Sequence, residues 1–70
     1  MEQEWIFSLR CYHSIGSGCP VECYREEGIG TSGFSYDECL DQARKEFRRR
    51  NSHCENVPSE QIEVLEYERG

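Results

Sequence analysis

Residues 34–50, FSYDECLDQARKEFRRR, predict a helix that is apolar on one side only. Ser35 is a favourable N-cap, and Glu38 three residues later completes a capping box. Acidic side chains in the first turns and three arginines in the last turn both suit the dipole of a helix. The apolar side chains recur at helical spacing, at Tyr36, Cys39, Leu40, Ala43 and Phe47. A helix over residues 36–50 must therefore bury one stripe against another layer of structure.

Three other segments have the character of strands. In the first, alternation places one set of side chains on a single face, namely Trp5, Phe7, Leu9, Cys11 and His13. After the turn residues SIGSG, the segment VECYREE alternates again, and QIEVLEYER favours a last strand, with a short helix capped by Ser59 as the alternative.

Residues 28–33, GIGTSG, match the GxGxxG pattern of dinucleotide-binding turns. We expect a loop there instead, because Glu26 and Glu27 just before it would repel a pyrophosphate.

The order strand, strand, helix, strand predicts a small α+β domain of the split βαβ type. The helical connection should return the third strand parallel to the second through a right-handed crossover. The first strand then lies between them, antiparallel to both. We expect a single domain over residues 1–70, with a three-stranded, mainly antiparallel sheet in the order 2-1-3 and one helix on one face. With 36% hydrophobic residues, the chain can fill one small core and no second one.

The net charge of −6 argues against a nucleic-acid partner, because phosphate binding normally requires a positive surface. It favours a protein partner with a basic surface. The first ten residues, MEQEWIFSLR, carry glutamates where a signal peptide has basic residues, and no segment has the length of a membrane span. We expect a cytoplasmic protein that does not enter the membrane and whose thiols stay reduced.

Cysteine and histidine gather in residues 11–24, CYHSIGSGCPVECY. If the turn centres near Ser17, Cys11 faces Cys23 across the hairpin. One reading of this segment is a zinc site with four ligands, Cys11, His13, Cys19 and Cys23. The spacing lacks the two tight pairs of a typical structural zinc site, and free cysteine also packs as a small buried hydrophobe. We predict no cofactor, with zinc as the alternative.

The end of the helix, RKEFRRR, concentrates basic side chains. One hypothesis is a zinc-stabilised module that contacts RNA or DNA through Arg44, Lys45, Arg48, Arg49 and Arg50. The other is that these residues complement the helix dipole and pair with Asp41 and Glu46 at helical spacing. The acidic balance of the whole chain favours the second hypothesis.

The sheet face that the helix leaves open is the predicted site of partner binding. In the same hairpin register, Arg10 faces Tyr24 and Tyr12 faces Glu22. Arginine and tyrosine are enriched at interface hot spots, and the last strand adds a row of glutamates at an open edge. The predicted partner-binding residues are Arg10, Tyr12, Tyr24, Glu60, Glu63, Glu66 and Glu68.

We expect no enzyme activity, because nothing orients a nucleophile and 70 residues leave little room for a pocket that excludes water. The leading hypothesis is a protein-binding inhibitor or modulator that occludes a basic surface of its partner. In size, charge and compact fold the chain resembles small acidic phage-encoded inhibitors of host defence, including anti-CRISPR proteins. That resemblance rests on no motif and carries over no residue. A homodimeric structural subunit, with the tyrosine face or an open edge buried against a second copy, is the other alternative.

Overall fold

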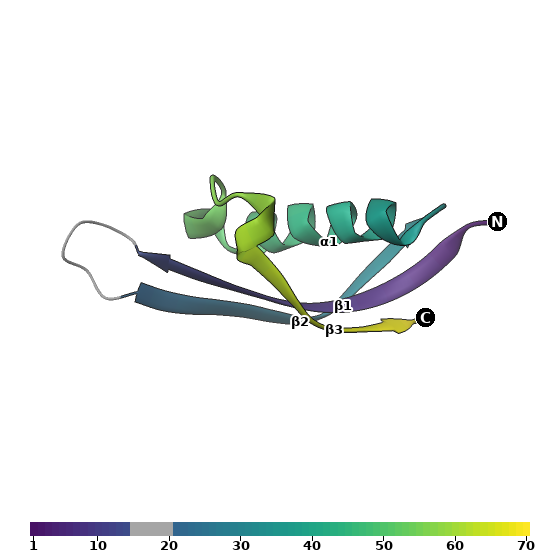
Figure 1. Cartoon of the computed structure of the whole chain (residues 1–70), viewed down its shortest axis with the longest axis horizontal. Helices are drawn as coiled ribbons and strands as arrows, with labels where there is room; N and C mark the ends of the chain where they lie inside the picture. The colour runs from purple at the N-terminus through teal and green to yellow at the C-terminus, as the bar shows by residue number, and fades with distance from the viewer. Residues whose placement is uncertain (15–20) are drawn as a thin grey trace.

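The computed structural model describes residues 1–14 and 21–70, and it confirms the predicted split βαβ architecture (Figure 1). Three strands form one sheet in the order β2-β1-β3, in which β1 is antiparallel to both neighbours. Helix α1 lies along one face of this sheet (Figure 1). The elements in chain order are β1 (Gln3–Ser14), β2 (Val21–Gly33), α1 (Tyr36–Arg50), the 3-10 turns η1 (Ser52–Cys54) and η2 (Ser59–Gln61), and β3 (Ile62–Arg69).

The core forms between the central strand and the helix. Alternation along β1 places Phe7, Leu9 and Cys11 on the helix side. All three are fully buried, as the two-residue period of side chains along a strand predicts. The stripe of α1 that meets them consists of Cys39, Ala43 and Phe47. The neighbouring strands and the segment after the helix complete the core with Ile29, Cys54, Val57 and Ile62. The sheet, α1 and the segment that follows the helix therefore form the whole buried apolar cluster of the described residues.

Helix α1 has the bounds that its capping signals predict. The Ser35 side chain accepts a hydrogen bond from the backbone N–H of Glu38, at 3.2 Å. The Glu38 carboxylate in turn accepts the backbone N–H of Phe34, at 2.8 Å, one residue earlier than in a standard capping box. At the other end, Asn51 donates its backbone N–H to the carbonyl of Phe47 and ends the helix.

The prediction of a loop over residues 28–33 is wrong, because β2 continues through them to Gly33. Ile29 pairs with Phe7 and is buried, and Thr31 pairs with Trp5 and donates its hydroxyl to the Trp5 carbonyl. The long first strand offers backbone partners to residues 29–33. These pairings outweigh the weak intrinsic preference of glycine for strands.

Both outer strands bulge at the same level of the sheet. Between Phe7 and Leu9, β2 inserts one extra residue relative to β1, and β3 does the same between Ser8 and Leu9. On β2 the bulge includes Gly28, which has φ +69°. A side chain is strained in that backbone conformation, so glycine is strongly favoured there.

We predict that Gly28→Ala lowers the free energy of unfolding by about 1–2 kcal/mol, the cost of left-handed backbone for a residue with a Cβ. Gly30→Ala is the matched control, because its Cβ would meet nothing within 4 Å and its φ is not positive. That variant should be neutral within about 0.5 kcal/mol. Urea unfolding followed by far-UV circular dichroism measures both, and equal losses would show that the bulge does not constrain Gly28.

Candidate functional site

The hairpin register differs by one residue from the predicted one. Cys11 pairs with Tyr24, and Tyr12 pairs with Cys23. A shift of one residue moves every side chain of a strand to the opposite face. Tyr24 therefore lies on the helix side, partly buried against the core, and its predicted place on the open face is wrong. Cys23 takes the exposed position beside Tyr12 instead.

The same register separates the predicted zinc ligands. Cys11 is buried on the helix side, whereas Cys23 is exposed on the open face, so the predicted juxtaposition of the two is wrong. The backbone of His13 pairs with that of Glu22, and Cys19 lies outside the described residues. Within residues 1–14 and 21–70, no three histidine, cysteine or acidic side chains are arranged to hold a metal ion.

Three of the described cysteines, Cys11, Cys39 and Cys54, are fully buried among apolar side chains. Burial, with a hydrogen bond to the Cys11 thiol, raises the pKa of the Cys54 thiol to about 11. A thiol with that pKa stays protonated at neutral pH and is a poor nucleophile. These cysteines therefore act as core side chains.

The open face brings together three of the predicted partner-binding residues. Arg10 forms an ion pair with Glu63 of β3 at 2.6 Å, and its guanidinium lies 5.1 Å from the centre of the Tyr12 ring. Half of the Tyr12 side chain is exposed. Glu60 does not join this group, because it lies in the turn η2 and not on the last strand. The prediction that Glu60 belongs to the glutamate row of β3 is therefore wrong.

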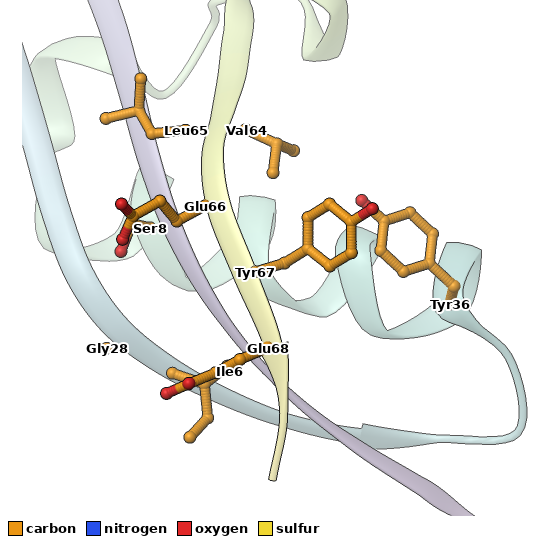
Figure 2. A pocket seen from close by; sticks show the side chains of 9 residues that line it. All are labelled: Ile6, Ser8, Gly28, Tyr36, Val64, Leu65, Glu66, Tyr67 and Glu68. Carbon is orange, nitrogen blue, oxygen red and sulfur yellow. The ribbon is translucent and has the colours of Figure 1, made fainter.

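Farther along β3 the open face is acidic. Glu66 pairs with Ser8, Glu68 pairs with Ile6, and both carboxylates are exposed. Figure 2 shows both glutamates on the same side of β3 as Leu65, Ser8 and Ile6. A shallow groove of about 560 Å³ wraps around this part of the strand. In the described part of the chain, neither Glu66 nor Glu68 takes part in an ion pair.

On the helix side of the same stretch of β3 lies an aromatic cluster that the sequence reasoning missed. The ring of Tyr67 lies beside that of Tyr36 in the first turn of α1 (Figure 2), with 5.2 Å between the ring centres. The ring centre of Trp5 is 5.8 Å from that of Tyr67. Tyr67 keeps 57% of its surface exposed, because α1 packs mainly over β1 and β2. Helical spacing predicts Tyr36 in the core stripe of the helix, and the pattern of residues 61–69 predicts Tyr67 on the last strand. Nothing in either local pattern indicates that their rings meet.

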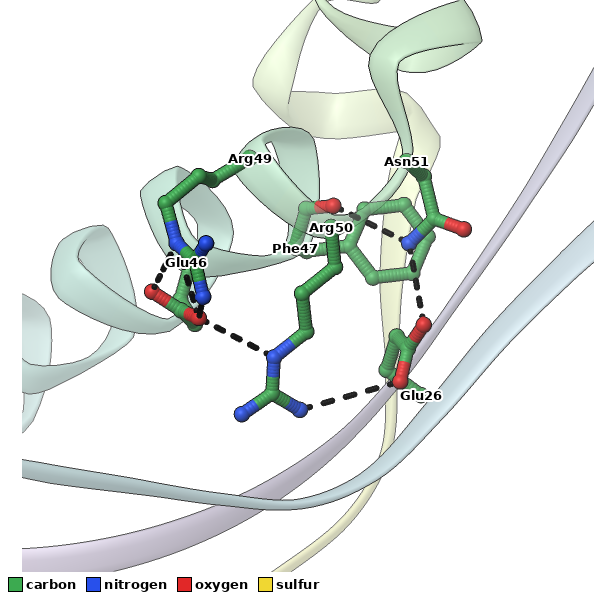
Figure 3. Close-up of polar contacts among 6 residues, drawn as sticks. All are labelled: Glu26, Glu46, Phe47, Arg49, Arg50 and Asn51. Carbon is green, nitrogen blue, oxygen red and sulfur yellow. Dashed lines mark hydrogen bonds and ion pairs between the residues drawn. The ribbon is translucent and has the colours of Figure 1, made fainter.

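The basic end of α1 is occupied by contacts within the chain. Arg49 and Arg50 both bind the carboxylate of Glu46, and Arg50 also reaches Glu26 on β2, at 3.7 Å (Figure 3). Asn51 adds a hydrogen bond to the other oxygen of Glu26, at 3.3 Å. This cluster links the end of the helix to the edge strand β2.

The remaining basic residues of the helix also have partners. Lys45 pairs with Asp41 at 3.0 Å, as its helical spacing predicts. Arg48 donates to the carbonyl of Val57 and to the Ser59 hydroxyl, both at 2.9 Å. Arg44 donates to the carbonyl of Ile62 at 3.4 Å, where pairing with Asp41 was expected. The five basic side chains thus make contacts within the chain. The second hypothesis for this segment, in which they serve the fold, describes these contacts.

Neither α1 nor any shorter helical turn in the described ranges has the length and apolar character needed to cross a bilayer. No protein-family model matches the chain, and comparison with curated proteins and with solved structures finds no significant similarity. A function must therefore be inferred from the geometry of the open face and of the β3 edge.

We predict that acid weakens the cluster around Glu46. Hydrogen bonds from Arg49 and Arg50 lower the pKa of the Glu46 carboxyl from 4.5 to about 2. The stability that this group contributes is present above pH 4.5 and is lost as the pH falls towards 2. Between these values the free energy of unfolding should fall more steeply in the wild type than in Glu46→Gln. Urea unfolding at several pH values measures the slopes. Glu55→Gln, at an exposed position, should keep the wild-type slope, and an unchanged slope in Glu46→Gln would contradict the prediction.

The register also predicts which thiols react. In a Cys19→Ser background, an aromatic disulfide reagent should modify Cys23 rapidly, and the three buried thiols should react only as the protein unfolds. A further Cys23→Ser substitution should remove the fast phase. Slow reaction of Cys23 would contradict the observed register and support the one in which Cys23 faces Cys11.

Proposed function

We propose that this protein is a non-enzymatic modulator that binds another protein and covers a basic surface on it. Its binding surface is the open face of the sheet together with the exposed edge of β3. The contacts would come from Arg10, Tyr12, Glu63, Glu66 and Glu68.

The observation that carries this proposal is which charged side chains have partners within the chain and which do not. All eight basic side chains lie in the described residues, and each contacts a carboxylate, a carbonyl or an aromatic ring of the chain itself. Among the described residues, Glu66 and Glu68 have no such cation. These two exposed carboxylates of β3 are therefore available to an external cation and would speed encounter with a basic partner.

The shape of the surface supports contact with a macromolecule. The groove around β3 is shallow and lies beside an exposed strand, so it offers no chamber from which water is excluded (Figure 2). Beside it, the Arg10 ion pair and the exposed Tyr12 ring provide the side chains that are enriched at interface hot spots. An inhibitor of a nucleic-acid-binding defence protein, of the phage-encoded type that the chain resembles in size and charge, would use a surface of this kind.

The experiment is affinity capture with a tagged protein, followed by identification of the bound proteins by mass spectrometry. The charge-reversed variant Glu66→Lys/Glu68→Lys should lose the partners of the wild type, and 0.5 M salt should release them, because screening shortens the range of surface electrostatics. Glu55→Lys/Glu60→Lys carries the same change in net charge at two exposed positions away from the strand, and should keep those partners.

If the protein acts by occlusion, a second result is expected for any partner found in this way. The partner's own acidic ligand, such as a nucleic acid, should compete with the captured protein for the same surface. Partners that survive charge reversal at Glu66 and Glu68, or that bind their acidic ligand and this protein together, would refute the proposal.

A further inference from the structure

We infer that the C-terminal half of β3, residues 66–69, binds an extended basic segment of the partner as a fourth, antiparallel strand. This inference rests on the proposed function and specifies the form of the partner. The segment would alternate basic residues, facing the open side of the sheet, with apolar residues facing the side of α1.

The backbone of this half of β3 has unused hydrogen-bonding groups. Gly70 donates its N–H to the carbonyl of Glu4 on β1, at 3.0 Å. In an antiparallel pair, the backbone groups of successive residues point alternately towards the neighbouring strand and away from it. The N–H and C=O of Tyr67 and Arg69 therefore point away from β1, to the side on which β3 has no strand neighbour among the described residues.

Parts of the other sheet edges are already bound by side chains. On β2, the Gln42 amide of α1 binds both the N–H and the C=O of Ser32, at 3.2 and 2.5 Å. These are the groups that an added strand would use. At the start of β3, Arg44 already binds the Ile62 carbonyl, and the bulge at Leu65 interrupts regular pairing. The regular stretch of β3 after the bulge has no such contact on its outer side in the described part of the chain.

The two faces of this stretch select different side chains. On the side of α1, the exposed ring of Tyr67 packs beside Tyr36 and offers an apolar surface. On the open side, Glu66 and Glu68 offer carboxylates with no cation partner in the described residues. An added strand places its successive side chains on opposite faces, so one face of the ligand must be apolar and the other basic.

The same charges disfavour a second copy of this chain as the added strand. If Tyr67 pairs with Tyr67 of another molecule in antiparallel fashion, Glu66 lies opposite Glu68 on the open face. If Tyr67 pairs with Arg69, Glu68 lies opposite Glu68. Like charges directly opposite one another destabilise a pair of strands. A basic segment replaces that repulsion with attraction.

The test is a titration of the ¹⁵N-labelled protein, followed by NMR, with acetylated and amidated heptapeptides. The main probe is Lys-Val-Lys-Val-Lys-Val-Lys, and its control of equal composition is Lys-Lys-Val-Val-Val-Lys-Lys. The alternating peptide should shift the amide signals of residues 66–69 and bind at least about tenfold more tightly than the control, because only alternation satisfies both faces. Glu66→Lys/Glu68→Lys should lose this binding, and Glu55→Lys/Glu60→Lys should keep it.

Methylation of the peptide backbone tests for strand addition directly. In antiparallel pairing, the valines lie opposite Tyr67 and Arg69 and donate their N–H groups to them. N-methylation of the valines should therefore weaken binding at least about tenfold, the effect of losing one or two hydrogen bonds. N-methylation of the lysines, whose N–H groups point outwards, should change it by less than about threefold.

Each failure has a distinct reading. Equal affinity for the alternating and control peptides, with both weakened by charge reversal at Glu66 and Glu68, would overturn strand addition and leave the acidic surface as the binding site. Equal effects of the two methylations, or no binding of either peptide, would overturn strand addition as well. Shifts at residues 66–69 that depend on the concentration of the free protein would assign the edge to a second copy. The affinity capture decides the proposed function separately.

Discussion

The structure depends on the pairing of one long central strand with both of its neighbours. β1 is antiparallel to β2 on one side and to β3 on the other, and its own alternation buries Phe7, Leu9 and Cys11 under α1. Each residue of β2 and β3 that pairs with β1 takes its face from its partner there, since paired residues lie on the same side. The core, the open face and both edges are therefore consequences of where each segment pairs along this strand.

The position of the helix then makes the two edges different. α1 packs over β1 and β2, and from there its polar side chains reach the edge of β2 through Gln42, Arg50 and Asn51. These contacts bind backbone groups and a carboxylate that would otherwise face solvent. The far end of β3 has no comparable cover. Protecting one edge with a helix is a common way to prevent unwanted strand pairing, and an edge left uncovered is available for wanted pairing.

The same contacts explain how a chain with three consecutive arginines presents an acidic surface. Arg48, Arg49 and Arg50 are engaged with carbonyls, a hydroxyl and carboxylates of the chain. Their contribution is to hold the helix end and the following segment in place. The exposed carboxylates of β3 lie on the opposite face of the sheet and keep their charge free. Net charge alone indicated a basic partner, and the fold indicates the strand on which such a partner would act.

Local pattern in the sequence determined the helix, the alternation of the central strand and the order of elements, because capping, periodicity and the handedness of crossovers act over short distances. Tertiary structure decided the rest. The hairpin register depends on the connection between the strands, and one residue of difference moved Tyr24 to the core and Cys23 to solvent. The strand character of residues 28–33 came from pairing with β1, and the contact of Tyr36 with Tyr67 joins residues far apart in the chain. Such contacts form only when distant segments meet, and no local pattern encodes them.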